Sequence, residues 1–85
     1  MKTFSYTIKD PVGIHARPAG MLAKKAKEFQ SEITLQKGEK SANATRLMAV
    51  MGLCVKCGDT VTLTVEGSDE EIAAEALERF LRETL

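Results

Sequence analysis

The chain has 85 residues, of which 44% are hydrophobic, 28% are charged and 5% are aromatic, and its twelve basic side chains balance twelve acidic ones. A chain of this length forms one domain (residues 1–85) without room for a large substrate cavity, which argues against a self-contained enzyme. No apolar run reaches the roughly 20 residues of a transmembrane helix, and the N-terminal residues lack the apolar core of a secretory signal. We therefore expect a soluble, cytoplasmic protein without membrane insertion, and the few aromatic residues argue against nucleic-acid binding.

The charges are unevenly distributed along the chain. Residues 1–58 hold ten Lys and Arg against four Asp and Glu, whereas residues 59–85 hold two against eight. We expect one basic face and one acidic face, each able to attract a partner of opposite charge.

The first half of the chain predicts three strands and a helix. Apolar and polar residues alternate over residues 4–8, as in a half-buried strand, and residues 10–13 (DPVG) read as a turn. From Ala16 to Phe29 apolar residues recur at helical spacing, with lysines on the opposite face. Ile33 and Leu35 restart a strand, and the turn at residues 37–39 leads into a short partner strand at residues 40–43.

The second half predicts a short helix, a strand and a long helix. Residues 45–53 are rich in Met and Leu, and residues 60–65 alternate Thr with Val and Leu. Ser68 is expected to cap the start of the last helix, with Glu71 completing a capping box. Its expected apolar stripe comprises Ile72, Ala73, Ala76, Leu77, Phe80 and Leu81.

The element order is therefore β-α-β-β-α-β-α. Each strand has one apolar face and each helix has one apolar stripe. This pattern favours an α+β fold, in which three helices pack on one face of a four-stranded antiparallel sheet and the other face meets solvent.

The only histidine, His15, lies where a glycine-containing loop meets the first helix, in the stretch GIHARPAG. The first turn of a helix carries unpaired N–H groups and the positive end of the helix dipole, so a phosphoryl group on the imidazole is well placed there. Pro18 has no N–H, which leaves the backbone N–H groups of Ala16 and Arg17 as the nearest free donors. The Arg17 guanidinium matches phosphate oxygens, and neutral imidazole is a plentiful nucleophile near neutral pH.

Two other interpretations of His15 remain open at this point. A lone histidine in a short protein is usually a surface or capping residue. A metal site is less plausible, because no second histidine is present to share the metal.

The sequence resembles the HPr family, the histidine-containing phosphocarriers of the bacterial phosphoenolpyruvate-dependent sugar phosphotransferase system. The resemblance covers essentially all 85 residues and includes GIHARPA, residues 43–53 and the EGSDE stretch before the last helix. It implies an open-faced β-sandwich fold. It also implies a phosphoryl carrier that is not an enzyme and needs no cofactor. In this family, the residue matching His15 accepts a phosphoryl group on its δ1 nitrogen from phosphoenolpyruvate through enzyme I and passes it to sugar-specific IIA proteins. The resemblance also implies that Arg17 stabilises the phosphate.

One position departs from the family pattern. In Gram-positive relatives, an ATP-dependent kinase phosphorylates a serine at the start of the second helix. The matching residue here is Arg46, which cannot accept a phosphoryl group, and the neighbouring Thr45 is a weak substitute. We expect this kinase-controlled regulation to be absent or rewired.

The second predicted helix is too short to bury all of its apolar side chains, so some are expected to form an exposed patch. Plain core packing accounts for about half of them on helical geometry. The resemblance places the partner-binding surface here and on the first helix: Lys24, Lys27, Arg46, Leu47, Met48 and Met51. A monomer is expected, because a small carrier docks on several partners in turn.

Cys54 and Cys57 form a C-x-x-C motif. A four-ligand zinc site cannot be completed within the chain, and the motif does not precede a helix N-terminus where a thiolate would be stabilised, so two incidental thiols are the favoured interpretation. Two alternatives to the sugar phosphocarrier remain: a regulatory binding module such as a nitrogen-branch carrier, and a thiol redox protein that uses these cysteines.

Overall fold

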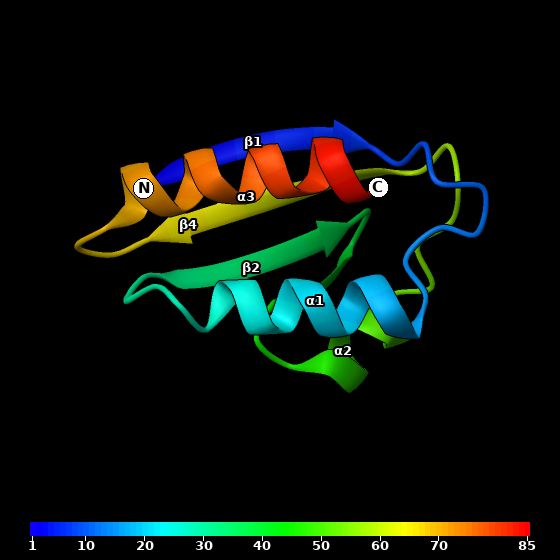
Figure 1. Cartoon of the computed structure of the whole chain (residues 1–85), viewed down its shortest axis with the longest axis horizontal. Coiled ribbons are helices and arrows are strands. Elements are labelled where there is room, and N and C mark those ends of the chain that lie inside the picture. Colours follow the sequence, from blue (N-terminus) through cyan, green and yellow to red (C-terminus); the bar gives the residue numbers. More distant parts are fainter.

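The computed structural model describes all 85 residues and shows four strands and three helices in the expected order (Figure 1). The elements are β1 (Lys2–Thr7), α1 (Ala16–Ala26), β2 (Glu32–Lys37), β3 (Lys40–Asn43), α2 (Leu47–Gly52), β4 (Thr60–Glu66) and α3 (Glu70–Thr84). None of the helices is long and apolar enough to cross a membrane. The α+β class predicted from the pattern of residues is confirmed.

The four strands form one antiparallel sheet in the order β1-β4-β2-β3. Leu63 of the central strand β4 pairs with Phe4 on one side and with Leu35 on the other. Because side chains alternate across a strand, this register brings the apolar residues of neighbouring strands onto the same face.

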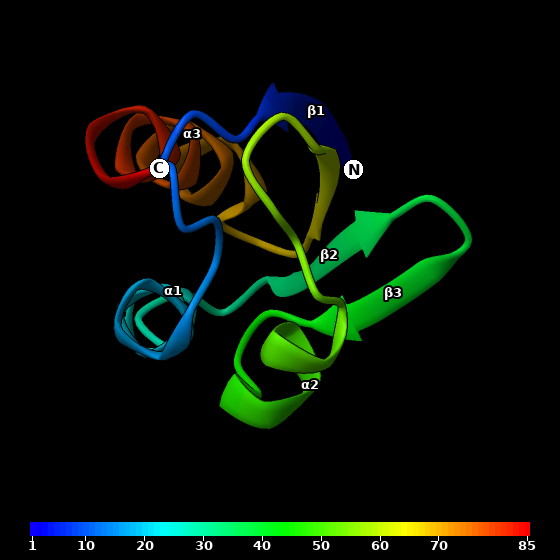
Figure 2. The same cartoon turned by 90° about the vertical axis from the view of Figure 1, so that its right-hand side faces the viewer.

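The three helices cover that apolar face, and Figure 2 shows α1 and α3 together on one side of the sheet. Helix α3 packs on β1 and β4, α2 packs beside β3, and α1 lies against both other helices. The largest fully buried side chains come from both layers: Ile8, Leu22, Ile33, Leu35, Val50, Val61, Leu63, Val65, Leu77 and Leu81.

The opposite face of the sheet is polar, as expected. Hydroxyl groups face each other across β1 and β4, with 3.1 Å between Ser5 Oγ and Thr62 Oγ1 and 2.9 Å between Thr7 Oγ1 and Thr60 Oγ1. Paired hydroxyls of this kind stabilise neighbouring strands while leaving the face compatible with water.

Two helices are shorter than the sequence predicts. Helix α1 ends at Ala26, and the Phe29 N–H donates to the carbonyl only three residues earlier, so Phe29 lies half-buried in the turn after the helix. Helix α2 begins at Leu47, because the Asn43 side chain accepts hydrogen bonds from both the N–H and the hydroxyl of Thr45 and holds that residue in a turn.

The predicted cap of α3 and part of its predicted apolar stripe are wrong. Asp69, not Ser68, is the residue before the first turn, and no side chain caps the helix, because the Asp69 carboxylate binds the segment after α1. Ile72 is 69% exposed, whereas Ala73, Leu77 and Leu81 are buried. The helix therefore packs on a narrower stripe than its apolar residues suggest.

Candidate functional site

The loop between β1 and α1 is fixed just before His15. The Ile14 N–H donates to the Val55 carbonyl (3.0 Å), and the Gly13 N–H donates to the Asp10 carbonyl (2.9 Å). Gly13 has a φ of +79°, and a Cβ there would lie 2.4 Å from the Val55 oxygen. Only glycine combines this backbone conformation with such a close approach, so Gly13 determines the path of the chain into α1.

The segment that carries Val55 is itself held in place by Asp59. The Asp59 carboxylate accepts the Lys56 N–H (2.9 Å) and pairs with Lys37 Nζ (3.0 Å). These contacts, led by the hydrogen bond from the Lys56 backbone, lower the pKa of Asp59 below its usual value. The loop before His15 is therefore bound to the Val55 segment, and that segment is in turn held by the contacts of Asp59.

His15 is the residue immediately before α1 and its side chain is exposed. Its backbone is extended, and its carbonyl accepts the first helical hydrogen bond from the Ala19 N–H (2.9 Å). The N–H groups of Ala16 and Arg17 have no acceptor in the protein, and Pro18 is buried in the same turn. Two backbone donors without acceptors therefore follow His15 directly at the start of α1.

The Arg17 side chain is exposed and free for a ligand. No carboxylate oxygen lies within 4.0 Å of its guanidinium, because it takes part in none of the ion pairs of the chain. An unpaired guanidinium next to an exposed imidazole can bind an anion attached to that ring.

His15 and Arg17 line an open hollow of about 360 Å³ that other elements complete. Its walls are formed by Asp10, His15, Arg17, Pro18, Met21, Glu83 and Thr84. Glu83 and Thr84 reach it because α1 begins and α3 ends at the same end of the molecule (Figure 1). The Leu85 carbonyl accepts the Lys9 and Asp10 N–H groups (2.6 and 2.8 Å), which holds the end of α3 against the loop.

Sequence reasoning missed Asp10, Met21, Glu83 and Thr84. Met21 had a usable signal in the sequence, since it directly follows the histidine motif on the same predicted helix. Glu83 and Thr84 had none, because only the packing of α3 beside α1 brings them to the hollow.

The residues of the predicted partner-binding surface have unequal exposure. Met48 is 76% exposed and Leu47 is 38% exposed, whereas Met51 is half-buried against the core and Val50 is fully buried. The exposed part of this patch is therefore mainly Leu47 and Met48.

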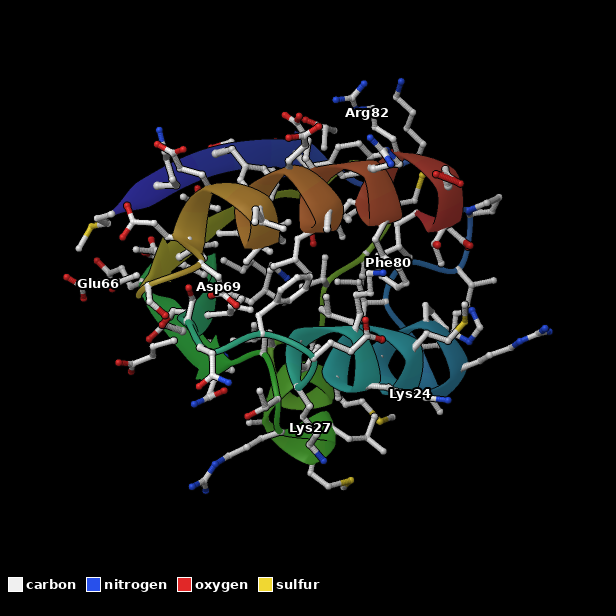
Figure 3. All side chains as sticks on the ribbon, turned by 60° about the vertical axis from the view of Figure 1, so that its left-hand side comes forward. Lys24, Lys27, Glu66, Asp69, Phe80 and Arg82 are labelled. Carbon is white, nitrogen blue, oxygen red and sulfur yellow. The ribbon has the colours of Figure 1, made fainter.

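Basic side chains flank that patch. Lys24, Lys27 and Arg46 are exposed and form no ion pair. Figure 3 shows both lysines extending from the side of α1 that lies next to α2. The structure thus groups unpaired positive charge and exposed apolar surface on these two helices. Cys54 and Cys57 are free, exposed thiols outside this group.

Comparisons with known proteins point to one family. The sequence model described as "PTS HPr component phosphorylation site" matches residues 2–83. The chain is 51% identical over 83 residues to phosphocarrier protein HPr of Lysinibacillus sphaericus, covering 98% of this chain and 94% of that protein.

Solved structures agree. A histidine-containing phosphocarrier protein of Mycoplasma has a TM-score of 0.94 at 40% identity, with 98% of this chain and 94% of that chain covered. A structure of an HPr dimer from Thermoanaerobacter tengcongensis has a TM-score of 0.77 at 40% identity, with 98% and 95% covered.

Proposed function

The chain belongs to the HPr family of the bacterial phosphotransferase system, whose members are phosphocarrier proteins, and on that premise we propose that His15 carries the phosphoryl group. The observation that supports His15 most directly is its position: an exposed imidazole beside two backbone N–H groups without acceptors and an unpaired guanidinium. No other side chain of this protein combines these features.

The transfer begins with a lone pair on Nδ1 of neutral imidazole. This nitrogen attacks phosphorus, an N–P bond forms and the bond from phosphorus to the donor breaks. Over the whole loading reaction, phosphoenolpyruvate supplies the phosphoryl group through enzyme I, and the released enolpyruvate takes up the proton that the imidazole loses. The N–P bond breaks in turn when a nucleophile of a IIA protein attacks the phosphorus.

Two parts of the chain stabilise the loaded state. The Ala16 and Arg17 N–H groups donate to phosphoryl oxygens, with the positive end of the α1 dipole behind them. The Arg17 guanidinium donates charge-assisted hydrogen bonds to the same oxygens. Neither contact requires the backbone to move, because the loop and the helix start are already fixed.

Enzyme I and the IIA proteins dock on the surface formed by Lys24, Lys27, Arg46, Leu47, Met48 and Met51. The exposed apolar side chains give buried area in the complex, and the unpaired cations attract acidic partners. Arg46 at the start of α2 leaves no hydroxyl for a serine kinase at this position. The protein works as a cytoplasmic monomer. Because a relative has been crystallised as an HPr dimer, the molecular mass in solution should be measured to check the monomeric state.

Intact-mass measurement tests the role of His15. The protein is incubated with phosphoenolpyruvate and a bacterial enzyme I, beside a His15→Ala variant. We expect one added phosphoryl group that is lost in acid and absent from the variant. No addition with several enzyme I homologues, or equal addition to His15→Ala, would contradict the proposal.

A further inference from the structure

Two carboxylates line the same hollow as His15. Asp10 comes from the loop after β1 and Glu83 comes from the last turn of α3, and Arg17 is the only Lys or Arg in the lining. Neither carboxylate pairs with Arg17. With neutral imidazole, the side chains around the hollow therefore hold one positive charge against two negative ones.

The two helix ends at the hollow also carry dipole ends of opposite sign. The first turn of α1 presents the positive end of its dipole, whereas the last turn of the 15-residue helix α3 presents the negative end of its own. Both ends are held at this place, because the Leu85 carbonyl accepts the Lys9 and Asp10 N–H groups. The hollow is thus positive on the side of α1 and negative on the side of α3 and Asp10.

We propose that Asp10 and Glu83 raise the free energy of phosphorylated His15 and so set how readily the phosphoryl group leaves, an inference that rests on the proposed function. A phosphoryl group brings about two negative charges at neutral pH. Neutral imidazole brings none, so the carboxylates repel the loaded state and leave the unloaded state almost unaffected. Groups that act on only one of two states shift the equilibrium between them.

This repulsion opposes the stabilisation by Arg17 and the N–H groups of α1. A carrier that bound its phosphoryl group too tightly would load well but release slowly to an acceptor. The carboxylates on one side of the hollow and the donors on the other together set an intermediate stability, at which both loading and unloading proceed.

The loading equilibrium measures this effect. Wild-type protein, Asp10→Asn, Glu83→Gln and the double variant are equilibrated with enzyme I at a fixed ratio of phosphoenolpyruvate to pyruvate, and the loaded fraction is read by intact mass. The Asn side chain keeps an oxygen for the Val12 N–H, which Asp10 Oδ1 accepts at 2.9 Å, so the loop is preserved. We expect each single variant to increase the loading constant about two- to fivefold at low ionic strength.

Glu66→Gln is the matched control, because it removes the same charge from an exposed, unpaired glutamate at the other end of the sheet (Figure 3). Raising the ionic strength should reduce this increase in the loading constant, and Glu83→Asp, which keeps the charge, should load like wild type. Single variants that load like Glu66→Gln would overturn the inference, as would an increase that persists unchanged at high salt. Failure of the wild type itself to load at His15 would instead contradict the proposed function.

Discussion

Asp69 joins two segments that lie 38 residues apart in the sequence. Its carboxylate accepts the Gln30 N–H (2.8 Å), the Ser31 N–H (2.9 Å) and the Ser31 hydroxyl (2.5 Å). These hydrogen bonds, led by that of the Ser31 hydroxyl, lower the pKa of Asp69. Gly67 is part of the same junction, since a Cβ there would lie 2.6 Å from Ser31 Cα.

The contribution of the Asp69 contacts should be visible in how the free energy of unfolding depends on pH. A carboxyl whose pKa is lower in the folded state adds stability above its unfolded pKa of about 4, and this stability is lost as the pH falls through the folded value. The pKa values of Asp59 and Glu70 are lowered as well. We therefore expect the free energy of unfolding to decrease as the pH falls below about 4.

Asp69→Asn should have a lower melting temperature than wild type at pH 7, by several degrees, because the amide is a weaker acceptor for three donors. Its free energy of unfolding should also change less between pH 4 and pH 2. Thermal unfolding at pH 7 measures the first effect, and urea unfolding between pH 4 and pH 2 measures the second. Parallel pH profiles for the two proteins would show that Asp69 makes no contribution of this kind.

At the scale of secondary-structure elements, α3 shows how packing selects among apolar side chains. Ala73, Leu77 and Leu81 form a row with spacing of four residues and are fully buried. Ile72 lies about 100° around the helix from Ala73, beyond the edge of the contact with the sheet. Composition alone does not distinguish these positions, because all of them are apolar.

Alanine substitutions should separate Leu77 from Ile72. Leu77→Ala removes a fully buried side chain and should reduce the free energy of unfolding by about 2–5 kcal/mol. Ile72→Ala removes a side chain that is 69% exposed and should change it by less than about 0.5 kcal/mol. Urea unfolding of both variants provides the comparison, and similar losses would mean that Ile72 packs in the core after all.

At the scale of the whole molecule, the basic residues of the acidic half of the chain (residues 59–85) form ion pairs, whereas most of those in the basic half (residues 1–58) do not. The arginines of α3 pair with glutamates one turn earlier on the same helix, Arg79 with Glu75 and Arg82 with Glu78. Most basic residues of the first 58 positions have no such partner: Lys9, Arg17, Lys24, Lys27, Lys40, Arg46 and Lys56. The unpaired positive charge lies in the half of the chain that carries the proposed docking surface.

Met48→Asp should weaken enzyme I binding about tenfold or more, because it places a carboxylate in the apolar centre of that surface. Its melting temperature should be close to that of the wild type, since the Met48 side chain is 76% exposed. Ile72→Asp is the control, because Ile72 is similarly exposed on α3, outside the surface. Titration calorimetry gives the affinities, and equal affinities for both variants would contradict the assignment of Met48.

The order and type of all seven elements follow from the sequence, as does the position of His15 and Arg17 at the start of the first helix. These features are local: the alternation of a strand, the spacing of a helix and the first turn of a helix each depend on residues close together in the chain. For the same reason, the family resemblance was visible in short stretches such as GIHARPA.

The ends of the helices and the other residues around His15 depend instead on tertiary packing. Helix α1 stops at Ala26 in front of a segment that Asp69 binds from the far end of the chain, and the same bonds leave α3 without a side-chain cap. Asp10 and Glu83 meet in one hollow because α3 packs beside α1. Such contacts depend on how the layers pack, and no local pattern of residues encodes the distance between two side chains that lie more than 70 positions apart.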